Sequence, residues 1–227
     1  MADIDFNLAA AHRRIAAACA AAGRSPAAVR LLAVSKSFDA AAIRGAHAAG
    51  QREFGENYLQ EALEKITQSP RDGVLWHFIG PIQSNKTHAI AEHFDWVHTV
   101  DRLKIASRLS EQRPPQLAPL QVCVQVNISA QASKSGCALE EAPDLCQAVA
   151  NLPGLRLRGL MAIPAPAAIA DPRAAYRRLR ELFESLQRSG LEVDTLSAGM
   201  SDDFEAAIAE GATIVRIGTA IFGKRSA

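Results

Sequence analysis

The sequence predicts an α/β fold, namely a single (β/α)8 TIM barrel with an extra N-terminal helix, in one domain spanning residues 1–227. Strand-like apolar runs alternate with helix-like segments along the whole chain, which is typical of a parallel α/β architecture. About eight such units fit a chain somewhat shorter than the ~250 residues typical of this barrel. No G-x-G-x-x-G turn follows the first run, so the competing open sheet lacks the usual signature of dinucleotide binding.

A helix is predicted ahead of the first strand. Asp3 and Asp5 stand at its beginning, and its apolar stretch is short and mostly alanine, so we interpret it as a surface helix rather than a signal peptide. Its apolar side chains share one helical face: Leu8, Ala11, Ile15, Ala18 and Ala22.

Mainly apolar runs predict the strands. In chain order they are residues 29–35, 52–55, 75–80, 96–100, 120–128, 155–163, 195–199 and 213–218, of which 52–55 is the weakest. Helical patterns between them are AAIRGAHAAG, YLQEALEKI, NKTHAIAEHF, LCQAVANL, AAYRRLRELFESLQ and DFEAAIAEG. The proline-containing segments RPPQLAP and IPAPAA are interpreted as loops.

The composition argues against several classes of partner. The 25 basic and 24 acidic side chains nearly cancel, so nothing favours nucleic acid or an anionic membrane. No stretch approaches the roughly 18 apolar residues of a membrane span. Arginines 173–180, interleaved with Glu181 and Glu184, predict a solvated helix face. The four cysteines form no CxxC motif, which favours free thiols in a reducing cytoplasm and no metal site.

The first apolar run ends in the segment LLAVSKSF, which places Lys36 just beyond a predicted strand. Such a lysine is usually a solvated loop charge, but a positioned lysine of lowered pKa forms Schiff bases with carbonyl compounds. Among the other lysines, Lys86 and Lys134 could line the barrel mouth. None of the others ends an apolar run: Lys65, Lys86, Lys104, Lys134 and Lys224.

Two loops are candidates for binding phosphate. In these barrels the active site lies at the carboxyl ends of the strands, and phosphate often binds the loops after strands seven and eight. Ser201 follows the seventh run at an expected helix N-cap, and Gly218 and Thr219 follow the eighth. Backbone N–H groups there could hold a phosphate. Ordinary capping and a tight turn are the alternative interpretation.

Arg216 lies within the eighth, otherwise apolar run. A buried arginine needs a partner. The partner could be an acidic neighbour such as Glu53, or a ligand at the barrel mouth. Because closure makes strands seven, eight and one neighbours, they span roughly 10 Å. These dimensions suit pyridoxal phosphate, with a carbonyl group at Lys36 and a ring over Arg216.

Six blocks carry a family resemblance: AVSK, FGENYLQE, WHFIGPIQSNK, VNISAQASKSG, GLMAIP and LSAGMSDDFEAAIAEGATIVRIGTAIFG. Together they resemble the pyridoxal phosphate homeostasis proteins, which are related to the barrel domain of bacterial alanine racemase. The similarity runs from about residue 5 to residue 223. One departure is Ala198, where family members more often carry methionine.

The resemblance implies a set of cofactor-binding residues. Lys36 would hold pyridoxal 5'-phosphate covalently as an internal aldimine, and Arg216 would face the pyridine nitrogen. Asn57 would lie beside the cofactor. The phosphate would be bound by Ser201, Gly218 and Thr219.

These residues favour a non-catalytic protein. An arginine at the ring nitrogen weakens the electron sink that carbanion chemistry requires. A two-base racemase needs an acid/base group on each face of the substrate. The resemblance implies that alanine racemase takes its tyrosine from a separate C-terminal domain, which we do not expect in the nine residues after Gly218. Tyr176 is expected to pack on an outer helix, whereas Tyr58 lies nearer the mouth.

The sequence therefore predicts a cytoplasmic protein that buffers or delivers pyridoxal phosphate and thereby affects amino-acid and keto-acid balance. Apo pyridoxal-phosphate enzymes would be recipients, and a monomer or weak dimer is expected. Two alternatives stay open. One is a small racemase using Lys36 with water or Tyr58. The other is an aldolase-like barrel in which Lys36 acts on a sugar phosphate with Glu53 or Glu56.

Overall fold

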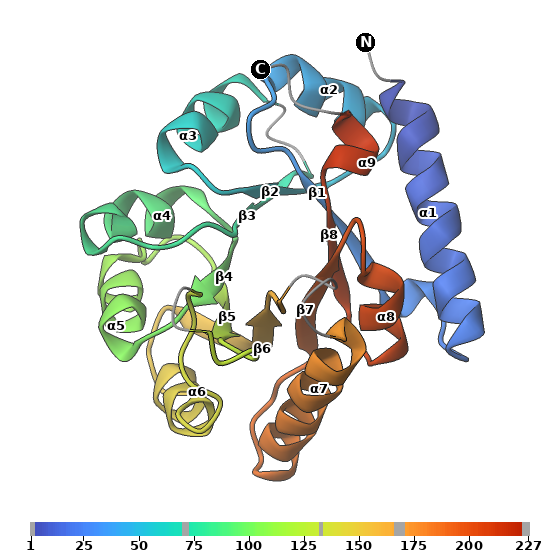
Figure 1. Cartoon of the computed structure of the whole chain (residues 1–227). Helices are drawn as coiled ribbons and strands as arrows, with labels where there is room; N and C mark the ends of the chain where they lie inside the picture. Colours follow the sequence, from blue (N-terminus) through green and yellow to red (C-terminus); the bar gives the residue numbers. More distant parts are fainter. Residues whose placement is uncertain (1–2, 70–72, 132–133, 166–170, 224–227) are drawn as a thin grey trace.

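The computed structural model describes residues 3–69, 73–131, 134–165 and 171–223, and these form a closed barrel of eight parallel strands (Figure 1). The strand order is sequential and β8 pairs with β1, so the predicted (β/α)8 fold is confirmed. The strands are β1 (Arg30–Val34), β2 (Glu53–Glu56), β3 (Leu75–Phe78), β4 (Trp96–Val100), β5 (Leu120–Val126), β6 (Leu155–Ala162), β7 (Thr195–Met200) and β8 (Ile214–Ile217).

Helices surround the barrel and follow each strand, as Figure 1 shows. They are α2 (Ala40–Ala48), α3 (Leu59–Gln68), α4 (Thr87–His93), α5 (Leu103–Gln112), α6 (Ala142–Ala150), α7 (Pro172–Arg188), α8 (Phe204–Ala209) and α9 (Thr219–Phe222), with short 3-10 turns η1 (Pro26–Ala28) and η2 (Ser84–Lys86). Helix α5 is absent from the predicted patterns. It buries Ile105, Ala106 and Leu109 on one face, so its sequence carries the helical period although it begins without a capping side chain.

The predicted N-terminal helix is α1 (Ile4–Ala21), capped by the side chain of Asp3, which accepts a hydrogen bond from the N–H of Phe6. It lies outside the barrel beside α2, α8 and α9 (Figure 1). Its buried face is Leu8, Ala11, Ile15 and Cys19, which confirms the amphipathic surface helix. Among the described residues, no helix is long and apolar enough to cross a membrane.

The core has two layers. One fills the space between the sheet and the helices, and the other fills the barrel interior. The interior cluster comprises Leu32, Val34, Ile79, Trp96, Cys123, Met161 and Ile214. All four cysteines are buried free thiols, as predicted. Burial raises the pKa of the Cys123 thiol to about 12, so this cysteine is an apolar packing group.

The arginine-rich face of α7 is not simply solvated, so that prediction is wrong in part. Arg173, Arg177 and Arg180 all form ion pairs with Glu210, which is only 3% exposed at the end of α8. The shared carboxylate ties α7 to α8. Glu210 lies 30 residues beyond Arg180 in the sequence, so the local charge pattern of α7 could not predict this pairing.

The barrel interior provides a direct test of the packing. Leu32 is fully buried there, and Leu32→Ala is expected to reduce the free energy of unfolding by about 2–5 kcal/mol, because it removes apolar contacts and leaves a cavity. Urea titration measures the loss. The control Leu103→Ala, at a side chain 46% exposed on α5, is expected to change stability by less than about 0.5 kcal/mol. Equal losses would contradict the described interior.

Candidate functional site

A cavity of about 260 Å³ opens at the carboxyl ends of β1, β7 and β8. Its lining includes all six residues singled out in the sequence: Lys36, Asn57, Ser201, Arg216, Gly218 and Thr219. Val34, Ile79 and Ile163 add apolar walls. The fold thus brings to one place residues that are up to 183 positions apart, counting from Lys36 to Thr219.

The turn that carries Lys36 is held by a buried polar cluster. Ser35 donates to Oε1 of Glu56 at 2.6 Å, and the N–H of Ser37 donates to Oε1 of Glu61 at 2.5 Å. Ser37 has a φ of 66°, which is unusual for a residue with a side chain. The cluster therefore fixes the backbone on both sides of Lys36.

Lys65 is the centre of that cluster. Its Nζ donates to the carbonyl of Ser35 at 2.8 Å, to Oε1 of Glu56 at 2.9 Å and to Glu61. Lys65 is 4% exposed and Glu56 is fully buried. Burial raises the pKa of Glu56, and the charge of Lys65 opposes that rise. The sequence placed Lys65 correctly in a helix but gave no sign of this role.

Arg216 is 4% exposed and its guanidinium has three hydrogen bonds. One nitrogen donates to the carbonyl and the hydroxyl of Ser197, at 2.7 and 2.8 Å. The other donates to the carbonyl of Ala162 at 2.9 Å. The suggested salt bridge to Glu53 is wrong, because Glu53 pairs with Arg30 at 3.3 Å. Glu53 begins its strand, so it lies at the opposite end of the barrel from the cavity.

The loop after β7 is built by Asp203. Its carboxylate accepts hydrogen bonds from the N–H of Met200 at 2.7 Å and from the hydroxyl of Tyr176 at 2.8 Å. Asp203 is the N-cap residue of α8, so the prediction that Ser201 is the N-cap is wrong. Ser201 lies instead in the preceding turn, where it lines the cavity. Ala198 is buried in the core beneath this loop.

The loop after β8 lies beside it because β7 and β8 pair. Gly218 is the N-cap of α9, and its carbonyl accepts hydrogen bonds from the N–H groups of Ile221 and Phe222. A side chain at Gly218 would place its Cβ 3.0 Å from the carbonyl of Val34. Glycine therefore allows the chain to pass close to β1, next to the turn of Lys36.

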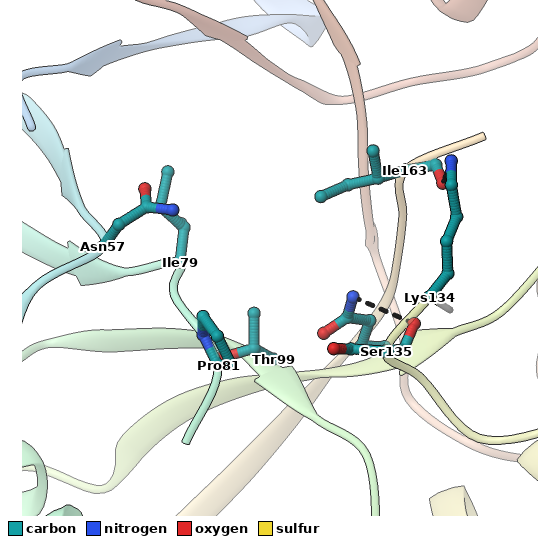
Figure 2. A pocket seen from close by; sticks show the side chains of 8 residues that line it. Asn57, Ile79, Pro81, Thr99, Lys134, Ser135 and Ile163 are labelled. Atoms are coloured by element: carbon teal, nitrogen blue, oxygen red, sulfur yellow. Dashed lines mark hydrogen bonds between the residues drawn. The ribbon is translucent and has the colours of Figure 1, made fainter. Parts of the chain in front are cut away.

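A second cavity of about 180 Å³ adjoins the first and shares Asn57, Ile79 and Ile163 with it (Figure 2). On its far side, Lys134 donates to the carbonyls of Ile163 and Pro164. The expectation that Lys134 lines the mouth is confirmed. Lys86 lies in η2 and lines neither of these cavities, and Lys224 falls outside the described residues.

Histidines near the site do not form a metal centre. No group of three or more His, Cys, Asp or Glu side chains within residues 3–223, apart from the undescribed gaps, could hold a metal ion. His98 is hydrogen-bonded to His77 and Ser197 inside the barrel. This contact could have been anticipated, because both histidines lie in predicted strands. Side chains alternate between the two faces of a strand, so every second one points into the barrel.

The fold and the arrangement of the cavity define a barrel of the alanine racemase type. The family model described as alanine racemase, N-terminal domain, matches residues 6–226. A pyridoxal phosphate homeostasis protein of Pseudomonas aeruginosa is 65% identical over 226 residues, covering 99% of this chain and 97% of that protein. The corresponding protein of Escherichia coli K12 is 56% identical over 229 residues, covering 99% and 98%.

A solved structure agrees with these relatives. PipY of Synechococcus elongatus with pyridoxal phosphate bound is 36% identical and superposes with a TM-score of 0.82, covering 97% of this chain and 100% of that one. The chain therefore belongs to the pyridoxal phosphate homeostasis protein family, which confirms the resemblance seen in the sequence blocks.

The cluster beneath Lys36 can be tested by breaking its ion pair. Lys65→Met leaves Glu56 charged and unpaired in the interior and is expected to cost about 3–5 kcal/mol of unfolding free energy at neutral pH. Burial raises the pKa of Glu56 and the charge of Lys65 opposes that rise, so removing Lys65 raises this pKa further, and the folded variant binds more protons than the folded wild type in mildly acidic solution. The loss should therefore shrink as pH falls.

Equilibrium unfolding at neutral and mildly acidic pH measures this dependence. The double variant Glu56→Gln/Lys65→Met removes both charges and should regain much of the lost stability at neutral pH. A double variant that is less stable than Lys65→Met, or a loss independent of pH, would contradict the pairing.

Proposed function

We propose that this protein binds pyridoxal 5'-phosphate and acts in its intracellular homeostasis by buffering or delivering the cofactor, without catalysing a reaction of its own. The observation that carries this proposal is one cavity lined by a lysine, a buried arginine and two hydroxyl-bearing loops. The names of the relatives and the cofactor bound in PipY support it. Amino-acid and keto-acid balance would follow from the supply of cofactor to other enzymes.

The residues present fit the cofactor in kind and in spacing. Because β7, β8 and β1 are neighbours, the loop after β8 lies one strand spacing from the strand that carries Lys36, and the loop after β7 lies two spacings away, or roughly 10 Å. Ser201 and Thr219 offer hydroxyl groups, and the backbone of Gly218 and Thr219 offers N–H groups for a phosphate. Val34 and Ile163 are apolar surfaces suited to the two faces of a ring.

Lys36 would hold the cofactor covalently. Its neutral Nζ would bond to the aldehyde carbon and form a Schiff base, with release of one water molecule. Asn57 would lie beside the ring, and the Arg216 guanidinium would face the pyridine nitrogen. The bound cofactor supplies an electron sink, which is strong only when that nitrogen is protonated. Arg216 disfavours this protonation because it is a buried donor that stays charged.

The tyrosines support a binding role rather than racemisation. Tyr176 is 2% exposed and donates to Asp203, so it packs as expected and supports the phosphate loop. Tyr58 is 54% exposed at the start of α3 and does not line the cavity. The aldolase-like alternative loses its carboxylates, because Glu53 pairs with Arg30 and Glu56 with Lys65.

The proposal also covers the location of the protein, the recipients of the cofactor and the oligomeric state. A cytoplasmic location suits the four free thiols. Apo pyridoxal-phosphate enzymes are the proposed recipients, and the open barrel mouth would release the cofactor to them. We propose a monomer or weak dimer, with neither nucleic acid nor a membrane as partner.

The covalent anchor has a direct test. Purified protein incubated with pyridoxal phosphate is expected to show a visible band that disappears on borohydride reduction, with peptide mapping placing the pyridoxyl group on Lys36. Lys36→Ala should lose the band, whereas Lys104→Ala on α5 should keep it because that helix lies outside the cavity. A colourless wild-type protein, or an adduct on another lysine, would overturn the assignment.

The absence of turnover has a separate test. Loaded protein incubated with L-alanine or D-alanine is expected to leave the enantiomer unchanged on chiral chromatography, because no described tyrosine lines the cavity to supply a second base. Alanine racemase serves as the positive control. Loss of chirality that depends on both Lys36 and Tyr58 would favour the racemase alternative instead.

A further inference from the structure

A row of polar side chains runs through the barrel interior from the cavity to the opposite end. Starting at Arg216, the contacts are Arg216 to the hydroxyl of Ser197 at 2.8 Å, and Ser197 to Nδ1 of His98 at 2.7 Å. Nε2 of His98 lies 2.9 Å from Nδ1 of His77, and Nε2 of His77 lies 3.4 Å from Oε2 of Glu53. Arg30 pairs with Glu53 at the far end.

Together with Arg30, these side chains come from six different strands and share the interior with apolar residues. His77, His98 and Ser197 are fully buried, so water does not compete for their hydrogen bonds. Buried polar groups need partners, and a partly satisfied network is costly. A row of this kind inside an apolar barrel therefore requires a reason other than packing.

The donors in the row all point in one direction. Arginine only donates, so the hydroxyl oxygen of Ser197 accepts from Arg216, and its own hydrogen is available to Nδ1 of His98 at 2.7 Å. A neutral His98 then carries its proton on Nε2 and donates to Nδ1 of His77. His77 in turn carries its proton on Nε2, facing the carboxylate of Glu53.

The surroundings keep both rings neutral. Burial lowers the pKa of His77 and His98 well below the ordinary value. The positive charges of Arg216 and Arg30 act in the same direction on His98. His77 stacks on Trp96, with ring centroids 5.4 Å apart. The opposite direction of donation would turn a lone pair of His77 toward the carboxylate of Glu53, which is unfavourable.

We propose that Ser197, His98 and His77 form a one-directional hydrogen-bonded relay, ending 3.4 Å from the carboxylate of Glu53, that positions the guanidinium of Arg216 against the cofactor ring. They are positioning residues, because they act through Arg216 rather than on the cofactor. The inference rests on the proposed function, in which Arg216 faces the pyridine nitrogen.

The first experiment measures the direction of the relay in the cofactor-free protein. Nitrogen-15 NMR of the histidine rings distinguishes the two neutral tautomers and the charged form. Both His77 and His98 are expected to be neutral and protonated on Nε2, with signals assigned by their loss in His77→Gln and His98→Asn. A proton on Nδ1 of His98, or a charged ring at neutral pH, would overturn the relay.

The second experiment measures its effect on the cofactor. Ser197→Ala keeps the bond from Arg216 to the Ser197 carbonyl but removes the hydroxyl link, and it should weaken pyridoxal phosphate binding by about three- to tenfold, as for one ordinary hydrogen bond. The absorption maximum of the bound cofactor should also shift. Thr195→Val is the matched control, because it removes a buried hydroxyl of the same strand that donates to Asp194.

A conservative replacement separates positioning from simple folding. His98→Asn places an amide oxygen near the position of Nδ1 and should retain more cofactor affinity than His98→Leu, which offers no acceptor. Equal affinity and an unchanged spectrum in Ser197→Ala would overturn the relay while leaving the proposed function intact. A wild-type protein that binds no pyridoxal phosphate would overturn the proposed function and the relay's role toward the cofactor. If a variant fails to fold, the NMR measurement of the histidine tautomers in the wild-type protein still tests the relay.

Discussion

Pairing between the first and last strands is the constraint on which the site depends. The register joins Leu32 to Arg216 and Ala33 to Ile217, so the turn of Lys36 is held next to the loop of Gly218 and Thr219. Without closure, the two ends of the sheet would lie on opposite edges and the lysine would have no phosphate loop beside it. A parallel barrel also has no exposed edge, so this arrangement leaves no strand free to pair with another chain.

Two networks of buried polar groups support the cavity, one beneath Lys36 and one behind Arg216. Glu56, Glu61 and Lys65 fix the turn that carries Lys36, and Ser197 with the barrel histidines holds Arg216. Both networks lie under the cavity rather than in it. The cavity-facing groups are thus preorganised by polar contacts that the ligand itself does not make, which reduces the ordering required on binding.

The sequence predicted the fold and five of the six lining residues from local patterns, whereas Asn57 was implied only by the family resemblance. Alternating apolar runs and helical segments identify the barrel, and the lysine after the first run marks the mouth. Prediction from the sequence failed for contacts between residues that are far apart in the chain. Ser201 is displaced from the N-cap by Asp203, whose carboxylate also bonds to Tyr176, and the partner of Arg216 is Ser197 rather than Glu53. The ion pairs of three α7 arginines with Glu210 were also not predicted from the sequence.

The sequence by itself determined the architecture and the residue types at the cavity, since strand periodicity and the order of the strands specify which residues meet at the carboxyl ends. The family was indicated by the resemblance of six sequence blocks. Only the tertiary structure decided how those residues are held. The direction in which Arg216, Ser197, His98 and His77 donate, and the pairing of Lys65 with Glu56, depend on interatomic distances of about 3 Å between separate strands and helices. A one-dimensional pattern states which face a side chain occupies, but not which of several buried polar groups lies within hydrogen-bonding distance of it.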